Sequence, residues 1–459
     1  MIKTHRRKTT RALGFLCLLI TAAYASVSGA GARPDEVERL SQDLTPIGAE
    51  RGPNASGSIP AWTGGITDPP AGYQPGDHHP DPFRGEKPLF RIDAGNAEEY
   101  RAQLSAGQVA MLQAYPGFYL EIYPTHRSAS YPERIYEMTR RNAANGALSE
   151  NGNAVVGVAE GFPFPFPDNA EELIWNHQLR YRGESSIRHI KMTAPTASGA
   201  FNEITMTVTT TNPYYLPGAT LESINSHFTM YEREVTTPPS MAGNALLVYE
   251  SLNQVAEPRK AWVYSPGRRR VMRAPNVAYD SPSAGTEGMH VSDMTDMFNG
   301  ALDRFEWELK GKREMYVPYN AYRLHGETVD SDDLLRPGHL DPGFLRYELH
   351  RVWVVEAKLR DGERHINSRR TFYLDEDSYQ ILMVDHYNSK NDLWRLSEAH
   401  PINFYEVPTL WTTVEIHHDL DARRYVVFRL DPEKPLSPFN VELDSGIFTP
   451  QALRRKGRR

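Results

Sequence analysis

The sequence has a single cysteine, Cys17, which lies in an apolar run from Leu13 to Ala25. Five basic residues precede this run, and the small residues Ala30 to Ala32 follow it. This layout is typical of a secretory signal peptide, so we expect residues 1–32 to be removed near Ala32 after Sec export to the periplasm. The mature chain then has no thiol, which excludes disulfides and cysteine metal sites.

Long apolar runs are scarce after Ala32, and basic residues are outnumbered by acidic ones. No later stretch approaches the roughly 20 apolar residues that cross a bilayer, so we expect a protein that is soluble once exported. The formal net charge of the whole chain is −7 at pH 7, which argues against nucleic acid as a partner. Residues 451–459 form a basic tail. We expect the tail to be frayed, with a contact to anionic lipid head groups or to an acidic partner as the alternative.

The motifs of common catalytic sites are also missing. The sequence has no GxSxG elbow, HExxH helix, Walker loop or GxGxxG turn. Two histidine pairs remain as metal candidates, His78 with His79 and His417 with His418. Adjacent histidines on an extended backbone point in different directions, so we expect these histidines to be structural and to bind no metal. Because the catalytic motifs are missing, we also expect no cofactor, no catalytic residues and no enzymatic activity. A metal-dependent hydrolase centred on His78 and His79 stays open as the third hypothesis.

Proline and glycine are concentrated in residues 33–90, where they disfavour regular helix and central strand. Aromatic residues, including Trp62, Tyr73 and Phe83, are spread through this segment, although disordered chains are poor in aromatics. We therefore expect an ordered, extended arm that docks on the main body by its rings. The FPFPFP run at 162–167 is interpreted as an extended strut packed on the sheet, with an aromatic surface for a partner or lipid as the alternative.

Residues 91–186 are expected to form short helices. Ser105 with Gln108 has the spacing of a capping box, and a further helix begins near Asn169 and has Gly183 as a candidate C-terminal cap. A capping-box spacing also marks a helix that begins at Asn96.

Apolar and polar residues alternate from residue 187 onward, for example at 204–210 and 347–359. Residues 371–386 predict a hairpin around an acidic turn. One-faced strands suit an antiparallel sheet, and a sheet of about eight or more strands tends to curl. The predicted fold class is therefore mainly β with α: a large curved antiparallel sheet over residues 187–450, with short helices and a long extended N-terminal arm.

A methionine-rich segment, GMHVSDMTDMFNG at residues 288–300, interrupts the strands. Methionine adapts to irregular ligands, so this segment predicts either an apolar lid over a cavity or side chains that fill a gap in the core. The residues expected to bind a ligand are Met289, Met294, Met297 and Phe298 in the lid, and Trp262 and Trp307 on the sheet.

Six distinctive segments are IPAWTGGI at 59–66, GDHHPDP at 76–82, YPTHR at 123–127, FPFPFP at 162–167, IWNH at 174–177 and KREMYVPYN at 312–320. Together they resemble the exported family called domain of unknown function 1329, over nearly all of the mature chain. The strand-turn-strand at 259–273 and the hairpin at 371–386 are similar to those of the LolA/LolB superfamily of periplasmic lipoprotein carriers.

The resemblance implies a LolA-like, incomplete β-barrel with helices closing its mouth around an apolar cavity, in which such carriers hold acyl chains. It implies no catalytic residues. Family members are often encoded near RND-type exporters and an uncharacterised outer-membrane protein family. We therefore expect a periplasmic carrier or adaptor that binds a hydrophobic, lipid-like ligand for envelope transport and outer-membrane biogenesis, with those two proteins as partners. The alternative is a non-carrying scaffold subunit that links an inner-membrane exporter to the outer membrane, and exposed aromatic rings would favour it.

Overall fold

The computed structural model describes residues 31–149, 151–275, 277–326, 329–430 and 439–456. The predicted signal peptide therefore lies, except for its last two residues, outside the described residues. A sheet of 15 strands dominates the fold. In pairing order its strands are β1 (Phe90–Ile92), β2 (Leu120–Tyr123), β14 (Tyr347–Leu359), β15 (Arg369–Asp375), β16 (Ile381–Tyr387), β17 (Leu393–Phe404), β18 (Thr409–Asp419), β19 (Arg424–Leu430), β5 (Ser185–Thr193), β6 (Glu203–Thr211), β7 (His227–Thr237), β8 (Ala245–Ser251), β9 (Lys260–Ser265) and β10 (Arg270–Arg273), with β11 (Phe305–Pro318) paired to β14 beside this path.

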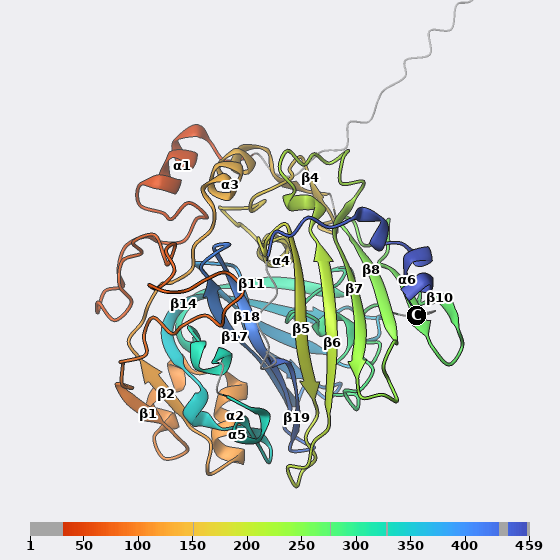
Figure 1. Cartoon of the computed structure of the whole chain (residues 1–459). Coiled ribbons are helices and arrows are strands. Elements are labelled where there is room, and N and C mark those ends of the chain that lie inside the picture. The colour runs from red at the N-terminus through yellow and green to blue at the C-terminus, as the bar shows by residue number, and fades with distance from the viewer. Residues whose placement is uncertain (1–30, 150, 276, 327–328, 431–438, 457–459) are drawn as a thin grey trace, which may run out of the picture.

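This sheet is curved but open. Its pairs are antiparallel except that β14 runs parallel to β2, which makes the sheet mixed. The path ends at β1 and at β10, and these two strands do not pair with each other. In Figure 1, β14, β17 and β18 run at a steep angle to β5–β8 because the sheet curls between them. The predicted fold class, a large curved sheet that does not close into a barrel, is confirmed.

Short elements surround the sheet. The helices are α1 (Pro34–Glu38), α2 (Ala106–Ala114), α3 (Glu133–Asn145), α4 (Ala170–Gln178), α5 (Ser331–Leu334) and α6 (Pro450–Lys456). Two small hairpins pair β3 (Ala147–Leu148) with β4 (Val155–Val156) and β12 (Leu335–Arg336) with β13 (His339–Leu340). Among the described residues, no helix has both the length and the apolar character needed to span a membrane.

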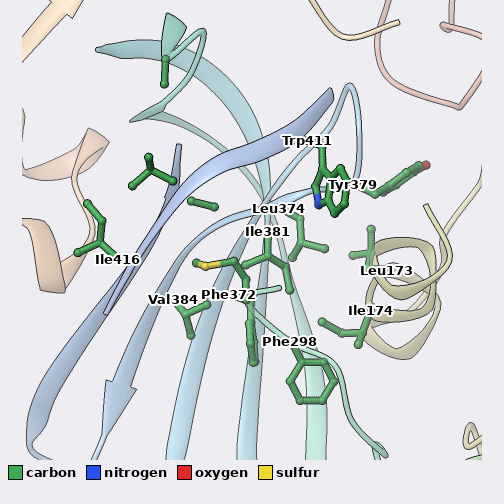
Figure 2. Close-up of a cluster of buried hydrophobic side chains, with 14 of the residues drawn as sticks. Leu173, Ile174, Phe298, Phe372, Leu374, Tyr379, Ile381, Val384, Trp411 and Ile416 are labelled. Atoms are coloured by element: carbon green, nitrogen blue, oxygen red, sulfur yellow. The ribbon is translucent and has the colours of Figure 1, made fainter. Parts of the chain in front are cut away.

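The main core lies between the sheet and α4. Figure 2 shows Leu173 and Ile174 of α4 beside the sheet residues Leu374 and Ile381, with Phe298 at the edge of the cluster. All five side chains are at most 1% exposed. Alternation along the strands puts their apolar side chains on the covered face, so burial of this face stabilises the packing of α4 against the sheet.

Helix α2 is anchored to the sheet by its N-terminus. The Ser105 hydroxyl accepts a hydrogen bond from the Gln108 backbone N–H at 3.1 Å, and the Gln108 side chain accepts one from the Ser105 N–H at 3.0 Å, which confirms the predicted capping box. The Asp385 carboxylate of β16 accepts from the Ser105 hydroxyl and from the N–H groups of Ala106 and Gly107. A carboxylate at this end of a helix is favoured by the helix dipole.

Other helix predictions need correction. The helix predicted from Asn96 is a 3₁₀ segment, Ala97–Gln103, and α4 ends at Gln178, before Gly183. The longest helix, α3, was not predicted. Its N-cap residue is Pro132, which has no side-chain hydrogen-bond acceptor, so the polar start signal of a helix is missing.

The proline-rich arm docks by its rings, as expected. The Trp62 indole N–H donates to the Ala129 carbonyl at 3.1 Å, and Phe83 stacks on His126 with 4.0 Å between ring centroids. The rings of Phe162 and Phe164 are also buried. These rings therefore do not form the exposed aromatic surface that would favour the scaffold alternative.

The basic C-terminal end is not frayed up to Lys456, so that expectation is wrong for the described part. These residues form α6, whose Leu453 is 1% exposed and packs in a cluster with Leu247 and Phe448. The Lys456 ammonium pairs with Glu232 at 2.7 Å. The basic residues dominate this part of the sequence, and the apolar helix face and the ion pair that hold it in place were not predicted.

Candidate functional site: a cavity on the curved sheet

A cavity of about 150 Å³ lies on one face of the sheet. Its wall comes from five strands that are consecutive in the sheet, β18, β19, β5, β6 and β7, and from the segment 290–299. Ile190, Val208, Tyr231, Trp411 and Phe428 supply much of the wall. Apolar and aromatic side chains with a few polar groups are the usual lining of a small-molecule site.

Alternation along the strands explains why these side chains share one face. Arg188 and Ile190 are two residues apart on β5, as Tyr231 and Arg233 are on β7, and all four line the cavity. Val208 of β6 pairs with Arg188 on one side and with Arg233 on the other. An apolar residue thus lies between two arginines in one row across the sheet.

Most charged groups at the cavity are matched within the protein. Asp296 accepts a hydrogen bond from Arg180 at 2.7 Å and also pairs with Arg182. Burial lowers the pKa of Arg180 to about 10, although Asp296 opposes this shift. The Arg188 guanidinium lies over the Trp411 ring, 4.4 Å from its centroid.

Arg233 and Tyr231 differ from these groups. Within the described ranges, no carboxylate lies within ion-pair distance of the Arg233 guanidinium, and the Tyr231 hydroxyl has no hydrogen-bond partner. Burial lowers the pKa of Arg233 and raises the pKa of Tyr231. The cavity therefore contains a guanidinium and a hydroxyl whose donors are not used by any described residue.

A chain of hydrogen bonds ends at Glu415 in the cavity wall. The Asn367 amide donates to His386 Nδ1 at 3.2 Å, His386 Nε2 donates to the Ser397 hydroxyl at 2.8 Å, and that hydroxyl donates to His417 Nδ1 at 2.7 Å. His417 Nε2 then donates to Glu415 at 3.0 Å. These tautomers are assigned from the order of donors and acceptors. In this order the Glu415 carboxyl group accepts the last hydrogen bond of the chain.

His290, Glu415 and His417 also form a possible metal site, because their ligand atoms lie within 4.8 Å of one another. Two imidazoles and a carboxylate are donors that Zn²⁺ accepts. His290 Nδ1 is hydrogen-bonded to the Ser283 hydroxyl at 2.7 Å, and burial lowers the pKa of His290 well below its usual value, so the ring is neutral. The bond from His417 to Glu415 satisfies two of the three groups without an ion. His350, Asp375 and Asp377 form a second cluster whose ligand atoms lie close enough to hold a metal ion.

None of the six side chains predicted to bind a ligand lines this cavity in the described part of the chain. Met289, Met294, Met297 and Phe298 are at most 4% exposed. Met297 and Phe298 belong to the main core, whereas Met289 packs in a smaller cluster with β5 and β6 residues. The polar residues of the same segment, among them His290 and Asp296, line the cavity instead.

The two predicted tryptophans lie apart from each other. Trp307 stacks on Phe372 with 5.7 Å between centroids. Trp262 packs against Tyr249, in the cluster that α6 covers. A role of these residues in ligand binding stays a prediction.

The segment 288–300 is held at both ends. Arg395 of β17 donates to the carbonyls of Gly288 and Met289, at 3.0 and 3.2 Å. Arg259 donates to the Asn299 carbonyl at 2.6 Å. These bonds place the segment as one wall of the cavity.

His78 and His79 both contact His325, but through different atoms of that residue. His79 is hydrogen-bonded through Nδ1 to the His325 ring at 2.9 Å and through Nε2 to Glu406 at 2.8 Å. His78 reaches the His325 backbone carbonyl at 3.1 Å. The pair ties the arm to the loop before α5.

Sequence reasoning missed Arg233, Tyr231 and Glu415. The alternation of β7 gives a signal that Tyr231 and Arg233 share a face. It does not reveal that β7 and β18 face one cavity, because β19 and β5, which lie between them in the sheet, are far apart in the chain.

Comparison with known proteins adds the family. The model of the family described as protein of unknown function (DUF1329) matches residues 91–454. This chain belongs to the DUF1329 family. The family membership predicted from the sequence is thus confirmed. The DUF1329 chain is also 41% identical, over 444 residues and 96% of each chain, to an uncharacterized protein of Pseudomonas aeruginosa.

Solved structures similar to this DUF1329 protein share little sequence with it. A DUF1329 family protein of Desulfovibrio piger is 14% identical, with a TM-score of 0.42 over 62% of this chain and 100% of that one. A putative outer membrane lipoprotein-sorting protein domain of Vibrio parahaemolyticus is 13% identical, with a TM-score of 0.42 over 62% and 97%. A LolA superfamily protein of Nitrosomonas europaea is 13% identical, with a TM-score of 0.37 over 62% and 98%.

Proposed function

We propose that this DUF1329 protein binds a hydrophobic or amphiphilic small molecule in the sheet cavity, as a carrier or adaptor of the cell envelope. The observation that carries the proposal is the apolar wall of Ile190, Val208, Trp411 and Phe428, which comes from four different strands of the sheet. A wall assembled in this way is set by the fold and is present before a ligand arrives, as is usual for small-molecule sites.

The size of the cavity limits what it encloses. A dry cavity of about 150 Å³ accommodates a molecule such as benzene, so about 150 Å³ takes one end of a lipid-like molecule and not a whole long chain. Each buried methylene contributes about 0.8 kcal/mol. A ligand held over a few carbons in this way binds reversibly and can pass to a partner without ATP.

The proposal also includes the cellular compartment in which the protein acts. The basic and apolar N-terminal segment supports export to the periplasm, where a carrier would bridge the two membranes. An RND-type exporter and an outer-membrane protein are the proposed partners. The carrier or adaptor role expected from the sequence is therefore retained as a proposal.

Filling the cavity should weaken ligand binding. Val208→Trp places an indole on the apolar floor between the two arginines, and we expect the affinity for decan-1-ol, measured by isothermal titration calorimetry, to fall at least about tenfold, as lost burial of about two methylenes implies. Thr207→Trp is the matched control, since Thr207 precedes Val208 on β6 and points to the other face of the sheet. Equal affinity in Val208→Trp and the unaltered protein would place the ligand outside this cavity.

A further inference from the structure

We infer that the cavity recognises the acidic head of an amphiphile, a carboxylate or a phosphate monoester, through Arg233 and Tyr231, while the apolar wall receives the first carbons of its tail. This inference rests on the proposed function, and it specifies the chemical class of the ligand.

The first argument is the uncompensated charge of Arg233. Arg233 is only partly exposed, and a guanidinium that is partly removed from water gains from an opposite charge or acceptors that offset its lost hydration. Arg180 and Arg182 share Asp296, and Arg259 pairs with Glu250 at 2.8 Å. Arg233 has no such partner in the described part of the chain, and it lines the cavity. An anion that enters the cavity would supply the missing partner.

The second argument is the neighbour of Arg233 on the same strand. Tyr231 is two residues before Arg233, so both side chains lie on the cavity face of β7. The phenol hydroxyl adds a donor beside the guanidinium fork, which is suited to the two oxygens of a carboxylate or phosphate. Both donors are unused within the described residues.

The third argument is the surroundings of this pair. Val208 is the cross-strand neighbour of Arg233, and Ile190 and Phe428 belong to one apolar cluster in the same wall. An anion bound at Arg233 with an apolar tail would place that tail on apolar side chains. A free inorganic anion would leave this surface without a ligand contact, so the geometry favours an amphiphile.

The test compares ligands that differ in their heads. Isothermal titration calorimetry measures decanoate, decyl phosphate, decan-1-ol and inorganic phosphate against the unaltered protein, Arg233→Gln, Tyr231→Phe and the control Arg273→Gln, which removes an exposed arginine of β10. We expect decanoate or decyl phosphate to bind the unaltered protein at least tenfold more tightly than decan-1-ol. Arg233→Gln should remove this preference, Tyr231→Phe should reduce it two- to fivefold, and Arg273→Gln should keep it.

Each other outcome is decisive. Decan-1-ol binding as tightly as decanoate overturns the inference and leaves the proposed function standing, whereas failure of all three decyl compounds contradicts both. Inorganic phosphate binding as tightly as decyl phosphate identifies a site for free anions and also overturns the inference. The melting temperature of ligand-free Arg233→Gln should be unchanged or higher, because no carboxylate loses its partner. A lower melting temperature together with a preserved head-group preference would make Arg233 a structural residue.

Discussion

Replacing Arg127 with methionine is expected to lower the free energy of unfolding by about 3–5 kcal/mol. The buried guanidinium donates to both oxygens of Asp377, at 2.7 Å each. It also donates to four backbone carbonyls of the N-terminal arm. Methionine retains part of the volume but leaves the buried Asp377 carboxylate without its guanidinium partner and removes the donor to the Pro60 carbonyl. Breaking one side of a buried pair is costly for this reason, whatever the net contribution of the intact pair.

Urea unfolding followed by circular dichroism measures this effect. Arg39→Met is the control, because Arg39 and Asp43 also form a 2.7 Å ion pair, but on the surface, where both side chains are about half exposed. Surface pairs contribute little, so the control should unfold at nearly the same urea concentration as the unaltered protein. Similar losses in the two variants would show that Arg127 does not hold the arm to the turn between β15 and β16.

Replacing Glu398 with glutamine is expected to stabilise the protein increasingly as the pH rises from about 4.5 to about 8. Burial raises the pKa of Glu398 to about 8, and a hydrogen bond from the Tyr347 hydroxyl opposes this only in part. In the unfolded chain the carboxyl ionises near pH 4.5, its ordinary value. Between these two values the native state holds a proton that the unfolded state has released. Native stability therefore falls by about 1.4 kcal/mol per pH unit from this group.

The neighbourhood of Glu398 supports the neutral form. Burial lowers the pKa of His418 to about 3, so the contact of 4.0 Å between His418 and Glu398 joins two neutral groups. Thermal unfolding across pH 4.5–8.5 measures the prediction, with Glu308→Gln as a control at an exposed glutamate. A constant difference between Glu398→Gln and the unaltered protein across this range would mean that Glu398 is ionised in the fold.

Local signals in the sequence predicted much of the sheet and some of the helices. The alternation at 347–359 gave the bounds of β14, and the acidic turn gave the hairpin of β15 and β16. The Ser105 capping box was visible because its two hydrogen bonds join residues three apart. By contrast, α3 begins after a proline without a capping side chain, and its position is set by tertiary packing of Ile135, which is fully buried.

The candidate site could be predicted only in part. The sequence pointed to segment 288–300, which does form a wall of the cavity, but through His290 and Asp296 rather than the methionines. Apolar residues of an irregular segment can pack either into the core or against a ligand. The sequence alone does not show which of the two they contact. The pairing of β19 with β5 brings the C-terminal strands beside the earlier ones, and this long-range step creates the cavity that holds Arg233.

The most direct test of ligand binding is mass spectrometry of an organic extract of the protein, purified from the periplasm without detergent. The account predicts a reproducible apolar or amphiphilic molecule in near-stoichiometric amount, and its loss from Val208→Trp but not from Thr207→Trp. A protein that yields no such molecule, and that also fails to bind added decan-1-ol and decanoate, would contradict the proposal that this cavity is a ligand site.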